Sequence, residues 1–577
     1  MKERLEKIKS RKLTGILAFC FFAWFVLAWL VIPNLNTIWS VFIQNETFTL
    51  EPVQKLLRSE RAMKSLRNSL ILAPCLAVTV GIVGISLVLI TEYFDVRGAK
   101  VLRLGYMTTL IYGGIILVSG YKFIYGENGY LTNLLLKIFP AMKSDWFEGF
   151  WAVLFVMTFS CTSNHMIFLR NAMRSVDFQT VEAAKGMGAS QWRVLRKVVL
   201  PVLTPSLLAV TILTFLTGLS ATSAPMLVGG REFQTITPMI IAFSNSVGSR
   251  DLATLLSLIL GIATIIILVG MKALERRGYY MSISKVKTKI VKQKIENPVV
   301  NVLVHIYAYV LFLIYVIPVV LIVLFSFTDV ASIAKRELSF ANFTLKNYLT
   351  VFTQATAYKP FAVSIVYSFI AALAVCLLIL LACRTMQRAP RRLGEALDYS
   401  LLIPWLLPTS LIAIGLIVTY NEPRFWVFNQ VLIGTPLIML IGYIINKIPF
   451  TLRMTKAAFH SLDGSLEDAA RNLGAGPMRT FFQVMLPNIM PTMLAIFALD
   501  FNGLLGDYEM SVMLYNPVYV PLGVTIKNLT QSTGNADNTA LTFVYAVIKM
   551  IIAAVVVYLV YGRGSKSKLA GEVETSV

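Results

Sequence analysis

The stretch EAAKGMGASQWRVLRKVVLPVLTP at residues 182–205 recurs in altered form as DAARNLGAGPMRTFFQVMLPNIMP at residues 468–491, which begins 286 positions later. An acidic residue with two alanines, a Gly-Ala pair, a Leu-Pro pair and a final proline keep the same spacing in both copies. Each stretch is polar and helix-prone, and each lies between long apolar runs. The chain is therefore predicted to be a duplicated membrane protein with one shaped loop per half.

The composition agrees with a membrane protein. The 577 residues include 56% hydrophobic and only 14% charged residues, which is more apolar surface than one soluble core could bury. The five cysteines lie in or beside apolar runs and lack the short paired spacings of zinc sites or disulfide frameworks. The three histidines are scattered along the chain, so no metal site is predicted.

Apolar runs long enough to cross a bilayer, about 20 residues each, predict twelve transmembrane helices. They fall near residues 13–33, 69–91, 104–122, 148–168, 199–221, 252–274, 301–327, 361–383, 398–420, 430–446, 487–509 and 541–561. Because twelve is even, both termini lie on one side of the membrane. The predicted fold class is an all-α polytopic membrane protein.

The net charge of +22 predicts the orientation rather than a nucleic-acid partner. Most of the 52 Lys and Arg residues lie in the tails and loops on the side of the termini, which places both termini in the cytosol. The basic start resembles a signal peptide, but its apolar run is too long, so we expect it to remain as the first span. The basic segment 276–298 is predicted to be a solvated cytosolic linker, with a lipid-surface or regulatory helix as the alternative.

The duplication extends beyond the two quoted stretches. Phe48-Thr49-Leu50 recurs as Phe343-Thr344-Leu345, and Asp177 matches Asp463 at the offset of 286. Because each repeat contains six spans, an even number, the two repeats run parallel and are expected to pair about a pseudo-twofold axis along the membrane normal, with a pathway between them. The predicted repeats are residues 1–275 and 299–577.

The two quoted stretches resemble the EAA loop of ABC importer permeases, whose consensus is Glu-Ala-Ala, three residues, Gly, and then about a dozen residues to Leu-Pro. The loops fall near residues 169–198 and 447–486, and we refer to them as the first and second EAA loops. The resemblance implies a binding-protein-dependent permease in fused two-repeat form with the type I ABC importer permease fold. It also implies that the helix before each glycine is a coupling helix that contacts a separate ATPase. The matching residues are Glu182, Ala183, Ala184 and Gly188 in the first loop and Asp468, Ala469, Ala470 and Gly474 in the second.

These residue types suit a rigid lever. Paired alanines allow close packing, the glycines permit the turn that ends the helix, and Pro201 and Pro487 are expected to open the next transmembrane helices. The resemblance assigns Glu182 and Asp468 to contacts with the ATPase. For Asp468 the alternative is a capping box with Ser465.

The nucleotide must be bound elsewhere. No G-x-x-x-x-G-K-[ST] run occurs in the 577 residues, so the chain is not predicted to be an enzyme or to hold a cofactor. ATP and Mg would be bound by two copies of a partner ABC ATPase, one for each EAA loop. The other expected partners are an extracellular or periplasmic substrate-binding protein and the membrane lipid.

Four polar residues in the eleventh predicted span are candidates for the pathway: Asp500, Asn502, Asp507 and Glu509. Ionisable groups at membrane depth are costly and usually face a pathway or a partner. Their counterparts in the first repeat are uncharged, so the pathway would be acidic on one wall only. The alternative places Asp507 and Glu509 in water at the outer end of the span and pairs Asp500 with Lys549 of the last span.

The cargo is less well determined than the transport class. The fused layout, together with Pro225, Leu514-Tyr515-Asn516-Pro517 and Pro521-Leu522-Gly523, resembles the ferric-iron permease branch of the family, which implies ferric iron. Polyamines, thiamine, phosphonates and sugar phosphates remain alternative cargoes. An ion-coupled secondary transporter would also show repeats and buried acids but would not need two lever-shaped loops, and no loop holds a convincing catalytic set for a membrane enzyme.

Overall fold

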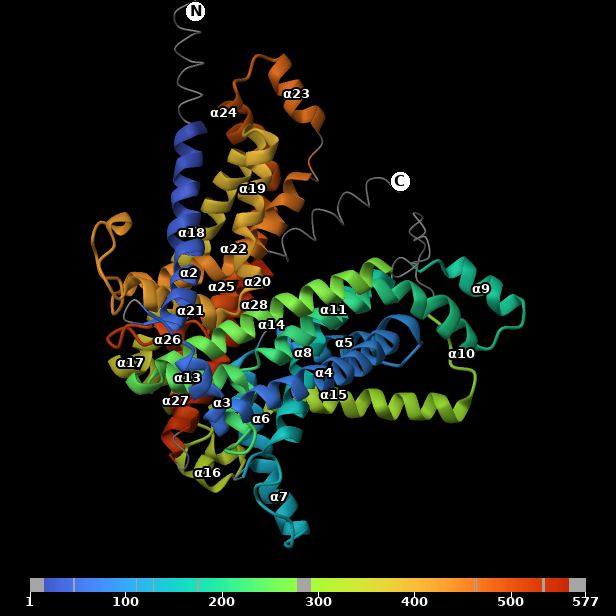
Figure 1. Cartoon of the computed structure of the whole chain (residues 1–577). Helices are drawn as coiled ribbons and strands as arrows, with labels where there is room; N and C mark the ends of the chain where they lie inside the picture. Colours follow the sequence, from blue (N-terminus) through green and yellow to red (C-terminus); the bar gives the residue numbers. More distant parts are fainter. Residues whose placement is uncertain are drawn as a thin grey trace, which may run out of the picture.

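The computed structural model describes residues 15–44, 47–110, 112–127, 129–173, 176–277, 292–460, 462, 464–531 and 535–559. In this part of the chain, the strands are the two-residue pair β1 (Ile43–Gln44) and β2 (Thr47–Phe48). Nearly everything else is helical (Figure 1), so the prediction of an all-α fold is confirmed.

Ten unbroken helices in the described residues are long and apolar enough to cross a bilayer. They span Gly15–Phe42, Glu60–Tyr93, Phe150–Met173, Gln191–Leu219, Arg250–Gly270, Pro298–Ser326, Ala355–Gln387, Pro436–Phe459, Met478–Leu505 and Ala536–Val556. Each of them overlaps a predicted span. The chain is therefore a multi-pass membrane protein.

The third predicted span of the first repeat is not one straight helix. Near 104–122 the chain forms α5 (Ala99–Tyr106), the short turn η3 (Thr108–Leu110) and α6 (Ile115–Tyr125). Gly114, with φ of 63° and ψ of −139°, directly precedes α6 in a conformation that only glycine adopts readily. Hydropathy did not reveal this break because apolar residues continue on both sides of it.

The equivalent span of the second repeat is also broken. Near 398–420 the helices α19 (Arg391–Leu401) and α20 (Ile403–Leu406) are followed by α21 (Thr409–Tyr420) after a bend of 104°. Leu407 is extended, as expected for a residue before a proline, and Pro408 ends the preceding helix. The spans predicted near 104–122 and 398–420 are therefore interrupted at the same place in each repeat.

The other elements of the first repeat and its end are η1 (Val26–Val31), α2 (Ile32–Phe42), α3 (Glu51–Arg58), α4 (Glu60–Val88), η2 (Leu89–Tyr93), α7 (Tyr130–Ile138), α8 (Phe150–Met173), α9 (Phe178–Gly186), α10 (Gln191–Val194), η4 (Leu195–Val199), α11 (Leu200–Leu219), α12 (Ser223–Val228), α13 (Ile236–Ser244), η5 (Val247–Ser249) and α14 (Arg250–Arg277). Those of the second are α15 (Pro298–Ser326), α16 (Val330–Lys335), η6 (Phe340–Asn342), α17 (Lys346–Thr353), α18 (Ala355–Arg388), η7 (Phe425–Val427), α22 (Pro436–His460), α23 (Gly464–Asn472), α24 (Pro477–Thr480), η8 (Phe481–Met485), α25 (Leu486–Leu505), α26 (Ser511–Leu514), α27 (Leu522–Gln531) and α28 (Ala536–Val557).

The two repeats match in detail at the recurring Phe-Thr-Leu. Thr49 Oγ1 accepts a hydrogen bond of 3.1 Å from the backbone N–H of Glu51, and Thr344 Oγ1 accepts one of 3.1 Å from Lys346. Both bonds lie at the starts of eight-residue helices, α3 and α17. The repeated tripeptide therefore begins the same short helix in each half.

The first helix of each repeat packs against the other repeat. The Gly15–Phe42 helix packs on α21, where the Tyr420 hydroxyl donates to the Ala28 carbonyl at 2.5 Å. Reciprocally, α15 packs on α5, where the Tyr106 hydroxyl donates to the Ala308 carbonyl at 2.7 Å. The two repeats, residues 1–275 and 299–577, are therefore separate in sequence, but in the fold each packs its first helix against the other repeat.

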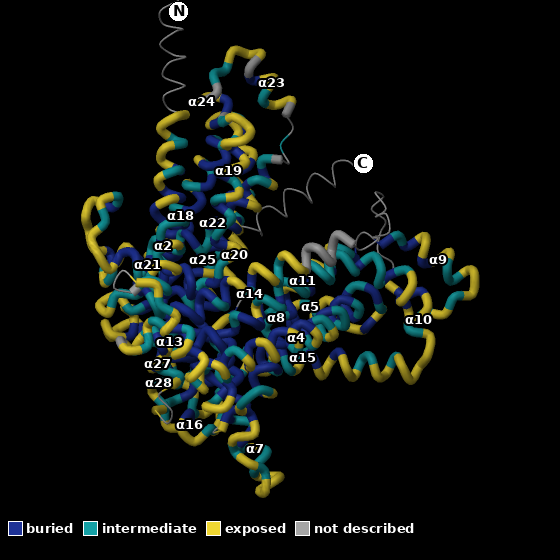
Figure 2. The backbone as a smooth tube through the Cα atoms, in the orientation of Figure 1, coloured by how far each residue is buried: buried dark blue, intermediate teal, exposed yellow. Residues whose placement is uncertain are grey.

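The EAA loops lie at the ends of two arms (Figure 1). One arm carries α9 and α10, and the other carries α23 and α24. Figure 2 shows a buried core where the arms meet and exposed residues at their tips. We refer to the opposite ends of the spans, where α7, α16 and α27 lie, as the far face.

Candidate functional site

The first EAA helix ends in a glycine turn. In α9, the backbone N–H of Ala189 donates to the Ala184 carbonyl at 3.1 Å, and that of Gly188 donates to Lys185 at 2.8 Å. These two bonds form a Schellman motif, which needs a residue of positive φ after the helix. Gly188 has φ of 81°, a conformation that costs other residues about 1–2 kcal/mol.

The second EAA helix ends in the same way. The backbone N–H of Ala475 donates to the Ala470 carbonyl at 2.9 Å, and Gly474 has φ of 78°. A Cβ atom added at either glycine would meet nothing within 4 Å. Backbone conformation alone therefore explains glycine at both positions.

The segment after each glycine forms a continuous helix that contains a π turn. Residues Leu195–Val199 and Phe481–Met485 are π-helical, and each turn precedes a Leu-Pro pair. The widened turn accommodates the missing N–H and the bulky ring of Pro201 and Pro487. Both prolines lie in the first turn of the next α-helix, α11 or α25, as expected. The helical path nevertheless continues without a break from Gln191 and Met478 through the π turns.

Each loop exposes two large apolar side chains at equivalent positions. Met187 is 83% exposed and Trp192 is 66% exposed in the first loop. Their counterparts Leu473 and Met478 are 88% and 63% exposed. Apolar groups that project this far from a protein at a helix turn are typical of a contact with a partner. The family consensus did not point to these four residues, but the offset of 286 could have identified them as pairs.

The two acids of the EAA triplets are both exposed. Glu182 Oε1 accepts a hydrogen bond from Gln293 Nε2 at 3.3 Å. Asp468 lies within α23, which begins at Gly464, so Ser465 is a helical residue rather than the residue that caps the helix. The capping-box interpretation of Asp468 is therefore wrong. Asp177 caps α9 by accepting from the Gln179 N–H at 2.9 Å, whereas its counterpart Asp463 lies outside the described residues.

The alanines of the triplets differ in burial. Ala183 and Ala469 are exposed, Ala184 is partly buried and Ala470 is buried. Only the second alanine of each triplet therefore packs against its own chain.

The end of the linker is attached to the first EAA loop. Gln293 is 4% exposed, its backbone N–H donates to the Tyr93 carbonyl at 2.8 Å, and its side chain also accepts from Lys185. The next residue, Lys294, accepts from Gln191 through its carbonyl. Residues 292–297, which we call the strap, thus join α9 and α10 to the end of the second span. Residues 278–291 of the predicted linker lie outside the described part.

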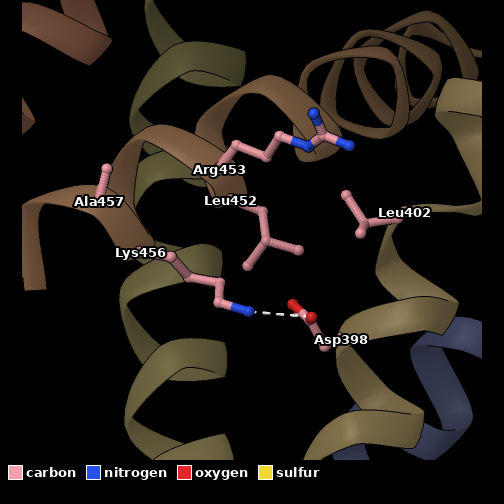
Figure 3. Close-up of a pocket in the computed structure, with 6 residues that line it drawn as sticks. All are labelled: Asp398, Leu402, Leu452, Arg453, Lys456 and Ala457. Atoms are coloured by element: carbon pink, nitrogen blue, oxygen red, sulfur yellow. Dashed lines mark hydrogen bonds and ion pairs between the residues drawn. The ribbon is translucent and has the colours of Figure 1, made fainter. Parts of the chain in front are cut away.

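One ion pair fixes the base of each EAA loop, and the two basic residues, though not their acidic partners, are 286 positions apart. Arg170 at the end of α8 contacts Glu92 at 3.0 Å, and Lys456 near the end of α22 contacts Asp398 at 2.9 Å. In Figure 3 a dashed line joins Lys456 and Asp398, which both line a cavity of about 370 Å³ between α19 and α22. The guanidinium carbon of Arg453, beside this cavity, lies 3.6 Å from the ring centroid of Trp405. Each helix that leads into an EAA loop is therefore tied to the preceding part of its repeat.

The acid predicted to line the pathway is fully buried. Asp500 Oδ2 accepts from Thr451 Oγ1 at 2.7 Å, and Oδ1 has no hydrogen-bond partner in the described residues. Asp500 makes no ion pair with Lys549 in the part of the chain that the structure describes; the Lys549 ammonium lies instead against the backbone of Gly506. The alternative that pairs Asp500 with Lys549 is therefore wrong.

The other three pathway candidates lie near the far end of α25. Asn502 is half-buried, and its Nδ2 reaches the Ala553 carbonyl at 3.5 Å. Asp507 accepts from both the N–H and the hydroxyl of Ser511, at 3.0 Å and 2.9 Å. Glu509 is half-buried in the same turn. None of the four residues lines the cavity beside Lys456, and their role in transport remains a prediction.

The chain matches a family model on both halves. Residues 9–277 and 299–563 each match the model described as "Binding-protein-dependent transport system inner membrane component". The same family model thus matches once in each half of the chain.

Individual proteins are also similar to this chain. A "Probable ABC transporter permease protein" of Sinorhizobium fredii is 38% identical over 539 residues, which cover 93% of this chain and 94% of that protein. A "Ferric transport system permease protein" of Actinobacillus pleuropneumoniae is 21% identical over 482 residues, or 82% of this chain and 67% of the relative. One chain in the crystal structure of a bacterial ABC transporter for alginate import aligns with 48% of this chain and 99% of its own length, at 17% identity and a TM-score of 0.38.

Proposed function

We propose a cargo and a set of partners for this chain, which belongs to the family of binding-protein-dependent transport system inner membrane components and is an ABC importer permease. The cargo is ferric iron, delivered by an extracellular or periplasmic binding protein. Two copies of a separate ATPase bind the EAA loops and hydrolyse ATP with Mg, so this chain itself needs no cofactor. The chain lies in a bacterial inner membrane with both termini in the cytosol.

The observation that carries the ATPase proposal is the paired geometry of the loops. Two helices of the same length end in the same glycine turn and project Met187 and Leu473 into solvent at equivalent positions. A rigid element with an exposed apolar tip can transmit force only if a partner surrounds it. Two equivalent tips therefore support two equivalent partner chains.

Ferric iron is supported by the extent of one resemblance. The relative named as a ferric transport permease matches 82% of this chain, across both repeats. The described residues hold no group of three or more His, Cys, Asp or Glu that could bind a metal ion. Iron would accordingly be bound by the separate binding protein and only passed on here. Polyamines, thiamine, phosphonates and sugar phosphates are the alternative cargoes, whereas the family excludes an ion-coupled secondary transporter.

Co-purification of the ATPase tests the partner. Glu182→Ala and Asp468→Ala are each expected to weaken docking by about fivefold, because an exposed charge contact contributes up to about 1 kcal/mol. Glu395→Ala, which removes an exposed acid on α19 outside both loops, should leave recovery unchanged. Full recovery of the ATPase with both loop variants would contradict the assignment of these acids. Mass analysis of the cargo bound to the binding protein tests iron directly, and an organic cargo without metal would contradict it.

A further inference from the structure

A cavity of about 580 Å³ lies at the far face, where the two repeats meet. The first repeat contributes the end of α6, the segment before α8 and the end of α12. The second repeat contributes the residue after α16, the end of α27 and the start of α28. We refer to this cavity as the far-face chamber. None of the four acidic and amide residues predicted for the pathway lines it.

Charged side chains of both signs line the far-face chamber: Lys122, Arg231, Arg336, Glu127 and Glu148. The two glutamates and Arg231 are exposed, whereas Lys122 and Arg336 are half-buried. Water and salt screen exposed charges strongly and half-buried charges much less. The inner part of the chamber is therefore positive.

Lys122 is one of the two half-buried cations of the chamber. It forms no ion pair within the described residues, although Glu148 and Glu127 act on it electrostatically from a greater distance. It stands near the end of α6, a helix whose other residues are uncharged and buried. A half-buried ammonium without an ion pair is costly unless an anion can approach it.

Arg336 is held in place from two sides. It follows α16 in the left-handed conformation, with φ of 58°, and its Nη1 donates to the Ile333 carbonyl at 3.2 Å. Its guanidinium carbon lies 4.8 Å from the ring centroid of Phe123. A cation over an aromatic face is attracted to the ring, so the guanidinium has a fixed position beside α6, the helix that carries Lys122.

Hydroxyl groups complete the lining. Ser119 and Thr530, from different repeats, share a hydrogen bond of 3.1 Å, and Thr539 and Thr542 lie on α28. In the structure these four hydroxyls donate to backbone carbonyls of their own helices. The guanidinium and the ammonium are therefore the groups of the chamber that recognise carboxylate, phosphate and phosphonate oxygens.

We propose that the far-face chamber binds an oxyanion group of the cargo as it enters the permease. This inference rests on the proposed function as an importer and narrows its substrate class. The oxyanion is either a free solute or a ligand that surrounds a ferric ion. A bare ferric ion would be repelled by Lys122 and Arg336, so iron passes this point as an oxyanion chelate.

Thiol labelling measures the potential of the chamber without requiring transport. Thr539→Cys is placed in a protein whose five native cysteines are replaced, and the purified protein is held in lipid nanodiscs. It is labelled with a sulfonate-bearing and a trimethylammonium-bearing methanethiosulfonate reagent. We expect the sulfonate reagent to be favoured on the order of tenfold relative to a free thiol, because a lined cleft concentrates ions of opposite charge. Lys122→Gln and Arg336→Gln should each lower this preference.

The control is Lys335→Gln, which removes an exposed charge next to Arg336 but outside the chamber, and it should leave the preference unchanged. Thr530→Cys gives the same measurement if Thr539→Cys fails to fold. A preference equal to that of a free thiol, or one for the trimethylammonium reagent, would overturn the proposal.

Protection from labelling separates the two sources of the oxyanion. Slower labelling with inorganic phosphate and methylphosphonate supports a free oxyanion, and slower labelling with ferric citrate alone supports a chelate. Protection by putrescine and by none of the oxyanions would contradict the proposed class. Labelling needs no ATPase, so a failure of ATPase docking would reject the proposed function without altering this result.

Discussion

At the scale of single residues, the EAA loops depend on backbone conformation more than on contacts. The two turn glycines have φ near 80° and open space around them, so a side chain there would be strained without any clash. The glycine positions and their role could be predicted from the sequence, because a Gly-Ala pair after a helix-prone segment is typical of this turn.

Replacing Gly188 or Gly474 with Val is expected to uncouple hydrolysis from transport. An ordinary residue at positive φ destabilises the turn by about 1–2 kcal/mol, and a β-branched residue destabilises it by more. The turn is therefore expected to open, which moves the exposed end of the EAA helix. The ratio of uptake to ATP hydrolysis in proteoliposomes measures this, and we expect it to fall at least about fivefold. Gly186→Ala, in the same helix and also in open space, is the matched control. A normal ratio in both Val variants, with normal expression, would exclude the lever mechanism.

A second residue-scale prediction concerns Asp500. Thr451→Val removes its 2.7 Å hydrogen bond and should cost about 1–3 kcal/mol, because a buried carboxylate loses its partner. Thr455→Val, one turn further along α22, removes only a 3.6 Å contact with the Met493 sulfur and should cost less. Melting temperatures of the purified variants give the comparison.

The same measurement tests the pairing of Asp500. Lys549→Met added to Asp500→Asn should not restore stability, since the two residues form no ion pair in the described structure. Full rescue by Lys549→Met would show that the two side chains do pair in the folded protein.

At the scale of elements, the two EAA loops differ in what supports them. The strap braces the first loop through Gln293, which lies 108 positions from Lys185 in the sequence and 111 from Glu182. Sequence patterns could predict the helices and the turns, because those depend on neighbours along the chain. They could not predict the strap, because a glutamine in a basic segment carries no signal of its distant partner. The π turns escaped prediction for a related reason, since a Leu-Pro pair also fits a helix start.

Gln293→Ala should loosen the first loop and leave the second unchanged. The loss of its side-chain hydrogen bonds is expected to lower local opening free energy by about 1 kcal/mol and to speed amide exchange about fivefold in residues 178–197. Exchange in residues 464–485 serves as the internal reference. Gln531→Ala, an exposed glutamine at the far face, is the control variant. If the ratio of amide exchange in residues 178–197 to that in residues 464–485 is the same in Gln293→Ala as in the unaltered protein, the strap does not brace the first loop.

At the scale of the whole molecule, hydropathy predicted where helices lie but not which helices touch. Ten spans could be found because their length and polarity are properties of the segment itself. The exchange of the first helices between repeats could not be found, because a uniformly apolar surface does not specify its neighbour. The far-face chamber could not be predicted from the sequence either, because Lys122 and Arg336 belong to different repeats and come together only in the fold.

Native mass spectrometry of the purified importer tests the central claim, that two equivalent EAA loops each dock one ATPase. We predict one permease with two ATPase chains for the unaltered protein. Met187→Asp and Leu473→Asp, which place a charge at the exposed apolar tips, should each leave one ATPase bound, and the double variant none. A complex with a single ATPase in the unaltered protein, or two ATPase chains retained by the double variant, would contradict this account.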